Sequence, residues 1–265
     1  MLSFEILLSC LNSNVKEIVK NSQFESDVLV VNQCDKDSCG VFMEKYGKIT
    51  VYDVNDRGLT KSRNFAIEHS EADICLLCDD DEKFRKGYKK KIIRAYEKIK
   101  EADVIIFNIG NRPAKFPKKV RRLEYFDLMK VSSWQISFRR ESLLKKGIRF
   151  DEDMGAGTPN GAEEEFKFLT DCRKAGLKIF YVPVVIADVA QESSTWFTGY
   201  DEKFFVNRGN TTRYIMGLPL SLLYAFYYAF AKRKNFGKIS WLKAFSFICK
   251  GIFENRFKKI KGNRK

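Results

Sequence analysis

Histidine is almost missing from this sequence, since His69 is the only one among 265 residues. A hydrolase that relies on a histidine–serine pair, or a metal site rich in histidine, is therefore difficult to build. The glycine fingerprints of Walker phosphate loops and of dinucleotide-binding loops are missing as well. His69 itself lies near the end of a predicted helix, where it complements the helix dipole.

The cysteines do not indicate a disulfide framework, because there are seven of them at irregular spacing. Cys75 and Cys78 form a C-x-x-C, but they lie in an apolar run that predicts a buried strand. An offset of three residues places them on opposite faces of that strand, which favours core packing over zinc or redox chemistry. Residues 1–5 lack the basic and long apolar regions of a signal peptide, so we expect a reducing compartment, the cytosol.

Acidic residues are scarce at the end of the chain. The sequence has 48 Lys and Arg against 34 Asp and Glu, a net charge of +14. Residues 232–265 contain 12 of the basic residues and one acidic residue, so the excess belongs to a tail. A globally basic coat for nucleic acid is therefore not expected. With 45% apolar residues, the chain is able to bury a sizeable core in one large domain or two small ones.

Apolar runs and helical patterns alternate along the first hundred residues and continue beyond them. This alternation favours βαβ units, and therefore an α/β fold with a mostly parallel sheet. In such sheets, ligands bind at the carboxyl ends of the strands. We expect strands at 4–8, 27–31, 49–52, 74–78 and 104–107, helices at 15–21, 59–69 and 86–100, and then a sheet-like stretch at 131–139, a helix at 163–174 and a strand at 178–185.

Three adjacent carboxylates, Asp79, Asp80 and Asp81, directly follow the predicted strand at 74–78. Like charges at this spacing repel each other, and a hard divalent cation relieves the repulsion by accepting oxygen ligands. In extended backbone Asp79 and Asp81 point to the same side, which makes them the natural pair. The alternative is a solvated acidic turn, but the position at the end of a strand favours a metal site.

A helix that starts at Gly58 is the second candidate. Gly58 and Thr60 shape its start, its free N–H groups favour an anion, and Lys61 and Arg63 add positive charge. The segment is therefore suited to bind a phosphate group. The alternative is an ordinary capped helix with solvated basic residues.

Three glutamates open the predicted helix at 163–174. One interpretation is that they only complement the helix dipole. However, Phe168 and Leu169 belong to the buried face one turn later, which tilts Glu164 or Glu165 inward. A partly desolvated glutamate has a raised pKa and is suited to act as a general base.

Taken in order, these segments resemble the motifs of family 2 glycosyltransferases with the GT-A fold, particularly bacterial enzymes that build capsular or other surface polysaccharides. The resemblance covers about residues 3–205. The matching segments are the first strand and loop Leu8–Asn12, the acidic loop Asn32–Asp35, the G-x-x-x-A-R-N helix start Gly58–Asn64 with Ser62 in place of Ala, the D-x-D at Asp79–Asp81, the catalytic Glu-Asp position at Glu163–Glu165, and Gln191–Trp196, which is similar to an E-S-S-T-W segment.

The resemblance implies a Rossmann-like GT-A domain that binds a nucleotide-diphosphate sugar, with Mg²⁺ or Mn²⁺ held by Asp81 and Asp79. It implies a general base at Glu165 or Glu164, and the glutamate triplet leaves this choice open. A histidine that completes the metal site in some relatives has no counterpart near Gln191. The implied contacts to the nucleotide sugar are Ser9, Leu11, Asn12, Gln33, Asp35, Gly58, Lys61, Arg63, Asn64, Asp79 and Asp80.

The implied activity is that of an inverting glycosyltransferase, in which the base activates an acceptor hydroxyl and the metal stabilises the leaving diphosphate. The expected acceptor is a lipid-linked saccharide of surface polysaccharide synthesis. One alternative is a sugar nucleotidyltransferase, but residues 10–15 lack the glycine-rich phosphate loop that this activity needs. Another is a non-catalytic module that binds membrane or nucleic acid, which leaves the acidic residues 79–81 unexplained.

The composition changes near residue 205, which predicts a catalytic domain at 1–205 and a helical region at 206–265. Residues 214–231 carry no charge, and residues 214–257 contain 12 aromatic residues. Aromatic residues suit the membrane interface, and clustered Lys and Arg suit anionic lipid. The uncharged stretch is short for a membrane span. We therefore expect peripheral or monotopic attachment to the cytoplasmic face of the cell membrane, with an ordinary helical subdomain as the alternative.

Overall fold

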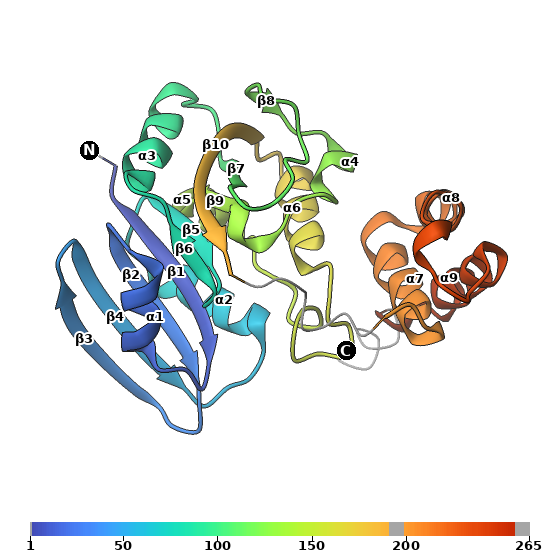
Figure 1. Cartoon of the computed structure of the whole chain (residues 1–265), viewed down its shortest axis with the longest axis horizontal. Helices are drawn as coiled ribbons and strands as arrows, with labels where there is room; N and C mark the ends of the chain where they lie inside the picture. The colour runs from blue at the N-terminus through green and yellow to red at the C-terminus, as the bar shows by residue number, and fades with distance from the viewer. Residues whose placement is uncertain (1, 191–198, 258–265) are drawn as a thin grey trace. The chain divides into compact units, whose positions relative to one another are not determined.

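The computed structural model describes residues 2–190 and 199–257, and the chain forms two compact units, Met1–Glu192 and Ser193–Lys265. The described strands all belong to the first unit, and the second unit is helical where it is described (Figure 1). The boundary expected at residue 205 falls inside helix α7 (Glu202–Met216). The two units therefore divide earlier than the change in composition indicates.

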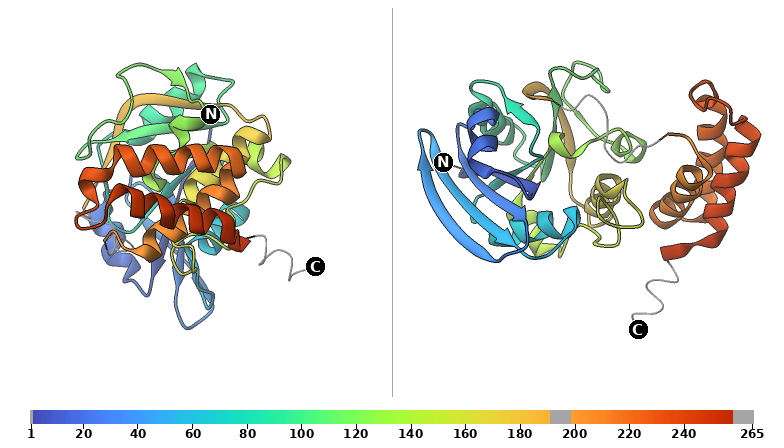
Figure 2. Two further views of the ribbon diagram at one scale, coloured as in Figure 1. Left: turned by 90° about the vertical axis from the view of Figure 1, so that its right-hand side faces the viewer. Right: turned by 60° about the horizontal axis from the view of Figure 1, so that its bottom comes forward.

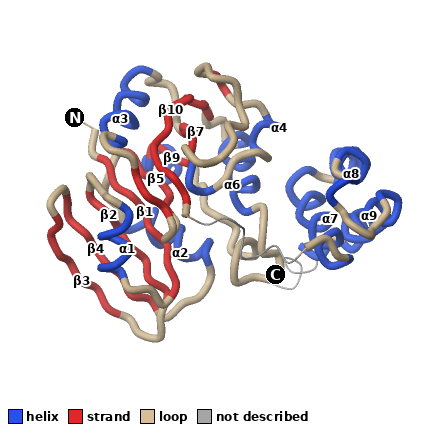
Figure 3. Tube along the Cα trace, viewed as in Figure 1, coloured by secondary structure: helices blue, strands red, loops and turns tan. Residues whose placement is uncertain are grey.

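The first unit is built on one ten-stranded sheet with helices on both faces (Figure 3). The strand order is β3-β4-β2-β1-β5-β9-β7-β10-β6, and β8 pairs with β10. The strands are β1 (Phe4–Leu11), β2 (Asp27–Gln33), β3 (Ser38–Glu44), β4 (Gly47–Val54), β5 (Ile74–Cys78), β6 (Glu82–Phe84), β7 (Val104–Ile109), β8 (Arg121–Arg122), β9 (Ile136–Arg139) and β10 (Ile179–Val189). The helices of this unit are α1 (Val15–Ser22), α2 (Leu59–His69), α3 (Tyr88–Lys98), α4 (Tyr125–Leu128), η1 (Ser133–Gln135), α5 (Arg140–Lys145) and α6 (Glu164–Lys174).

The sheet is mixed, so the expectation of a mostly parallel sheet is wrong. Strands β4, β2, β1 and β5 run parallel to one another, and β10 runs parallel to β7. In contrast, β9 lies antiparallel between β5 and β7, and β3, β6 and β8 each pair antiparallel with one neighbour. Only Lys45 and Tyr46 separate β3 from β4, and so short a connection requires antiparallel pairing.

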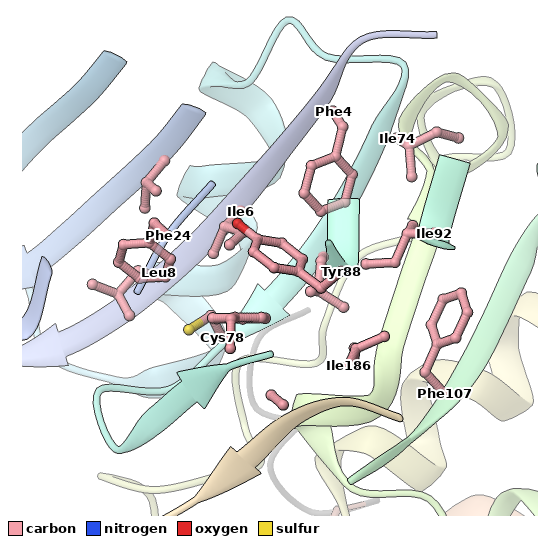
Figure 4. Close-up of a cluster of buried hydrophobic side chains, with 14 of the residues drawn as sticks. Phe4, Ile6, Leu8, Phe24, Ile74, Cys78, Tyr88, Ile92, Phe107 and Ile186 are labelled. Carbon is pink, nitrogen blue, oxygen red and sulfur yellow. The ribbon is translucent and has the colours of Figure 1, made fainter. Parts of the chain in front are cut away.

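The core on one face of the sheet is formed by alternate residues of the central strands (Figure 4). Side chains of β1 and β5 meet those of α3, and Tyr88 packs edge-on against Phe4 with ring centroids 6.1 Å apart. Cys78 belongs to this cluster, whereas Cys75 lies on the opposite face and contacts the hydroxyl of Ser70. Both cysteines are buried and unpaired, which agrees with a core-packing role for the C-x-x-C.

Helices α2 and α6 cover the opposite face. Phe168 of α6 stacks on Phe150 with ring centroids 4.1 Å apart, and its edge meets Phe138 of β9 at 6.2 Å. The aromatic contact to β9 fixes the position of α6 against the sheet. As a result, the amino end of α6 lies beside α2, where the glutamates at 164 and 165 meet Arg63.

The second unit contains α7, α8 (Leu218–Ala231), η2 (Arg233–Asn235) and α9 (Trp241–Glu254). Its core is small and rich in alanine, and consists of Phe205, Ala225, Ala229, Phe236, Ala244, Ile248 and Ile252. Helices α7 and α9 approach each other closely at Gly209 and Gly251. A Cβ atom on Gly209 would lie 2.0 Å from the carbonyl oxygen of Ile248. Within residues 2–190 and 199–257, no helix is long and apolar enough to cross a membrane.

Candidate active site

The carboxyl ends of β4, β2, β1 and β5 lie along one edge of the sheet, because these four strands are parallel and adjacent (Figure 1). Asn12 follows β1, Asp35 follows β2, Gly58 follows β4, and Asp79 follows β5. Residues that are far apart in the sequence are therefore brought to one edge, where α/β sheets bind ligands. Most of the predicted contacts to the nucleotide sugar lie here.

Gln33 connects three of these segments. Its backbone carbonyl accepts a hydrogen bond from the N–H of Asn12 at 2.9 Å, and its Oε1 accepts one from the N–H of Gly58 at 2.7 Å. Gly58 has a φ of 135°, which a residue with a side chain rarely adopts. Gln33 therefore fixes the loop after β1 against the entry of α2, and its side chain acts within the protein.

Several of the predicted contacts are open to a ligand. Leu11, Asn12, Asp35 and Asp80 are exposed, and Lys61 is partly exposed. Asp35 forms an ion pair with Arg57, a residue that the sequence motifs did not single out. The ammonium group of Lys61 lies 2.7 Å from the carboxylate of Asp56. Two basic side chains thus stand beside the start of α2, and each already has an acidic partner.

Ser9 and Asn64, like Gln33, are buried and bonded within the protein. The hydroxyl of Ser62 donates to the hydroxyl of Ser9 at 2.8 Å, which ties α2 to β1. The amide of Asn64 donates to the carbonyl of Phe150 at 3.0 Å and accepts from its N–H at 2.8 Å. Ser9 and Asn64 therefore fix α2 to its neighbouring segments beneath the exposed loops. These bonds favour a structural role over direct contact with a nucleotide.

Arg63 joins the acidic loop to the glutamates. Its guanidinium is 2% exposed and lies 3.2 Å from Asp79, 3.5 Å from Glu164 and 3.5 Å from Glu165. The group also lies over the ring of Phe150, 5.4 Å from its centroid. One buried cation thus faces three carboxylates from two different segments. The planar guanidinium, with five N–H donors, is suited to such a position, whereas an ammonium group is not.

Asp79 is held from three sides. One carboxylate oxygen faces Arg63, the other accepts a hydrogen bond from the hydroxyl of Ser133 at 2.8 Å, and its backbone N–H donates to Glu82 at 2.8 Å. The neighbouring Asp80 accepts a longer hydrogen bond, of 3.5 Å, from the hydroxyl of Ser13. These contacts fix the turn after β5 in one conformation.

Negative charge is concentrated in this turn. Desolvation and the adjacent carboxylate of Asp79 raise the pKa of Asp80. Burial, followed by the charges of Asp79 and Asp81, raises the pKa of Glu82 well above its usual value. One oxygen of Glu82 has no hydrogen-bond partner within the described residues. The turn therefore favours the approach of positive charge.

The glutamates at the start of α6 differ in their surroundings. Glu163 has a φ of 71° and precedes the helix. Glu164 is buried and packs against Gly155. A Cβ atom at position 155 would lie 3.4 Å from the side chain of Glu164. Burial and the charge of Glu165 raise the pKa of Glu164 to about 8, although Arg63 opposes this shift. Glu165 is more exposed than Glu164.

Residues 4–163 match the profile of Glycosyl transferase family 2, which amounts to more than half of the chain. This chain belongs to that family. No curated protein sequence matches it significantly. The enzyme is therefore a glycosyltransferase, and the resemblance found in its motifs is confirmed.

Solved structures of TarS from S. aureus share the fold of this family 2 enzyme. The structure of TarS residues 1–349 has a TM-score of 0.60 at 14% identity and covers 94% of this chain and 81% of that one. The same fragment in complex with UDP-GlcNAc has a TM-score of 0.58 at 15% identity, covering 92% and 75%. Its complex with UDP has a TM-score of 0.60 at 14% identity, covering 93% and 80%. The GT-A architecture is thus common to both proteins.

The acidic turn of this family 2 enzyme provides oxygen donors of the kind that a hard divalent cation prefers. Both oxygens of Asp79 are engaged by Arg63 and Ser133, and Asp81 occupies the last position of the D-x-D motif. Among the described residues, no group of three or more His, Cys, Asp or Glu is arranged to hold a metal ion. The donor type fits a metal, and oxygens of a bound diphosphate would have to complete the coordination.

Several supporting residues were not predicted from the sequence. Ser133 lies 54 positions from Asp79, and Glu82 is one more acid in an acidic segment. Arg63 was predicted to contact phosphate, whereas its partners are carboxylates. No local spacing reveals these contacts, because they depend on how distant segments pack. The predicted segment Gln191–Trp196 lies outside the described residues.

Proposed function

We propose that this glycosyltransferase transfers a sugar from a UDP-sugar to a saccharide hydroxyl with inversion of the anomeric configuration. The observation that supports this most strongly is the bridge through Arg63, which brings the acidic turn and the glutamates of α6 together. A donor on the acidic turn would then lie beside the group that activates the acceptor. The complexes of TarS with UDP and UDP-GlcNAc support the choice of uridine.

Glu165 is the general base in this proposal. A base has to be ionised before it accepts a proton, and the raised pKa of Glu164 keeps that group protonated at neutral pH. Glu165 is also the more accessible of the two to an incoming acceptor. Arg63 contacts both carboxylates and orients them. Glu164 then acts as a neutral partner beside the base.

Asp81, with Asp79 or Asp80, would hold Mg²⁺ or Mn²⁺ in this proposal. A bound divalent ion supplies stabilisation of the charge that develops on the leaving diphosphate. Arg63 and Ser133 keep Asp79 in place whether or not an ion is bound. The exposed loop residues Leu11, Asn12 and Asp35 would contact the nucleoside.

The proposed acceptor is a lipid-linked saccharide of capsule or other surface polysaccharide synthesis. Sugar nucleotides are found in the cytosol, so an enzyme that uses them on a lipid-linked acceptor would work at the cytoplasmic face of the membrane. The support for this placement is the character of the C-terminal unit, which is rich in exposed apolar and basic side chains.

A panel of nucleotide sugars, assayed by release of free UDP, tests the reaction. Glu165→Gln should lower the rate of transfer by about 10²–10⁴-fold, the usual contribution of a general base, and leave donor binding nearly unchanged. Glu164→Gln should retain most activity, because glutamine resembles a protonated glutamate. Glu17→Gln, on an exposed position of α1, serves as the control. Loss of activity in Glu164→Gln but not in Glu165→Gln would reverse the assignment.

Removal of metal tests the role of the acidic turn. Activity should disappear in excess EDTA and return with Mg²⁺ or Mn²⁺, and Asp81→Asn should lose about 100-fold or more in kcat. Glu17→Gln should respond to EDTA as the wild-type protein does. Full activity in EDTA would show that the turn stabilises the donor without a metal ion.

A further inference from the structure

Helix α8 buries small residues and exposes large ones, the reverse of the usual pattern. Its buried positions are Ser221, Ala225 and Ala229. Leu223 is 69% exposed and Tyr227 is 63% exposed, and Phe226 and Phe230 are exposed as well. No charged residue interrupts the helix. A contiguous row of large apolar side chains on a surface usually marks an interaction site.

The row continues onto α9, which lies beside α8 (Figure 2). The ring of Trp241 lies 6.3 Å from Phe226 and 5.8 Å from Phe230, and the ring of Phe245 lies 6.2 Å from Phe226. Leu242, next to Trp241, is exposed. We call these residues, together with Leu223 and Tyr227, the α8–α9 face. It is one apolar surface built from two helices.

Positive charge adjoins the α8–α9 face at η2, where α8 leads into α9. Residues 203–253 contain no Asp or Glu. In η2, the guanidinium of Arg233 lies over the ring of Phe230, 4.3 Å from its centroid. The other exposed basic residues of this segment include Lys232, Lys234, Lys238 and Lys243. The surface therefore combines an apolar centre with a cationic border.

We propose that the α8–α9 face docks in the plane of an anionic lipid bilayer. The apolar residues would enter the boundary between headgroups and acyl chains, and the basic residues would contact lipid phosphates and carboxylates. Tryptophan and tyrosine are suited to this depth. Docking of this kind lies in the plane of the bilayer and needs no helix that spans it. The proposal does not depend on the transfer reaction itself, whereas the membrane placement proposed above rests on the same C-terminal unit.

Charge argues against a second copy of the chain as the occupant. Two α8–α9 faces in contact would bring two cationic borders together, with no carboxylate from residues 203–253 to pair with them. An anionic lipid surface supplies the missing negative charge. It also accepts a flat apolar patch without requiring a matching cavity.

Sedimentation of the full chain with vesicles tests the proposal. Vesicles of phosphatidylcholine and phosphatidylglycerol are compared with vesicles of phosphatidylcholine alone. The double variant Leu223→Ser/Tyr227→Ser should bind the anionic vesicles about tenfold less well. Val41→Ser/Met43→Ser is the matched control, because these side chains, 60% and 71% exposed on β3, are as apolar and as accessible. The control should bind like the wild-type protein.

A charge variant, Lys234→Glu/Lys238→Glu, should also bind the anionic vesicles about tenfold or more less well, since each basic residue near such a surface contributes about fivefold. Thermal unfolding by circular dichroism checks that each variant is folded. Undiminished binding by either α8–α9 variant overturns the proposal. A dimer in solution that both variants dissociate would overturn it too, and would identify a second copy as the partner.

Discussion

Arg63 contacts both halves of the proposed active site. It is buried among Asp79, Glu164 and Glu165, and even with Glu164 neutral its removal leaves the negative charge of Asp79 and Glu165 without compensation in a poorly solvated place. Loss of one member of a buried ion pair costs about 3–5 kcal/mol. Arg63→Met should therefore lower the free energy of unfolding by about this amount.

Urea denaturation measures this effect, and Arg149→Met is the matched control. Arg149 forms ion pairs with Glu68 and Glu152, all three side chains are exposed, and the loss should be below about 1 kcal/mol. Equal midpoints for the two variants would contradict the bridging role of Arg63. The free energy of unfolding of an Arg63→Lys variant should lie between those of the two other variants, because a single ammonium group does not bond to three carboxyl groups at once.

Glu164 should make the protein less stable as pH rises. Its folded-state pKa is about 8, above the unfolded value of 4.5, so between these values the native state keeps a proton that the unfolded chain has released. Stability is then lost with rising pH across that window, by at most about 1.4 kcal/mol per pH unit. In Glu164→Gln the slope should be smaller, as measured by urea denaturation at several pH values. An unchanged slope would mean that Glu164 is ionised in the folded protein.

The residues of the site were predictable where a motif is local. The turn at 79–81, the glycine at 58 and the glutamates at 164 and 165 were each selected from neighbouring residues and predicted strand ends. What the sequence does not contain is the pairing between these segments. The partner of Asp79 is Ser133, and the partners of Arg63 are carboxylates, because tertiary packing places them so.

At the level of elements, Gly209 and Gly251 allow the backbones of α7 and α9 to touch. A Cβ atom on either glycine would lie 2.0 Å from a carbonyl oxygen of the other helix, and a backbone atom does not move aside as a side chain does. Gly209→Ala should separate the helices and lower the free energy of unfolding by about 1–3 kcal/mol. Differential scanning calorimetry should show this as a lower Tm.

Gly40→Ala is the control for that measurement, because a Cβ atom on Gly40 of β3 meets nothing within 4 Å. Its Tm should stay near that of the wild-type protein. A Gly209→Ala variant as stable as the control would show that α7 and α9 separate without cost. Gly251→Ala, which approaches the carbonyl of Val206, should behave like Gly209→Ala.

The elements themselves were predicted unevenly. The bounds expected for α2 and β5 match the structure, since each segment has a distinct boundary: Gly58 precedes α2, and the apolar run of β5 ends just before Asp79. The edge strand β3 was missed because most of its residues are exposed, and they show no alternation of apolar and polar residues. The region of β9 was recognised as sheet-like, but its antiparallel place between β5 and β7 depends on contacts between distant residues.

For the whole molecule, the uneven distribution of acidic and basic residues predicts that binding to anionic vesicles depends on salt. Residues 203–253 are free of acids, whereas the site in the first unit is crowded with carboxylates. Binding of the full chain to anionic vesicles should weaken as NaCl is raised, because the screening length falls from about 10 Å at 0.1 M to about 3 Å at 1 M. Vesicle sedimentation across a salt series measures this. Binding that does not change with salt would leave the apolar contact as the sole attraction.

The place of β9 in the sheet has a consequence for synthesis of the chain. Strands β1 to β5 come from residues 4–78 and are able to pair with one another soon after they leave the ribosome. The strand β7 has no neighbour in that group, and it joins β5 only through β9, at residues 136–139. Since a domain generally folds as a unit during synthesis, the strands of residues 4–78 have to wait for β7, β9 and β10 before the sheet is complete. Both halves of the proposed site would therefore form together, only after residue 189 has been added to the chain.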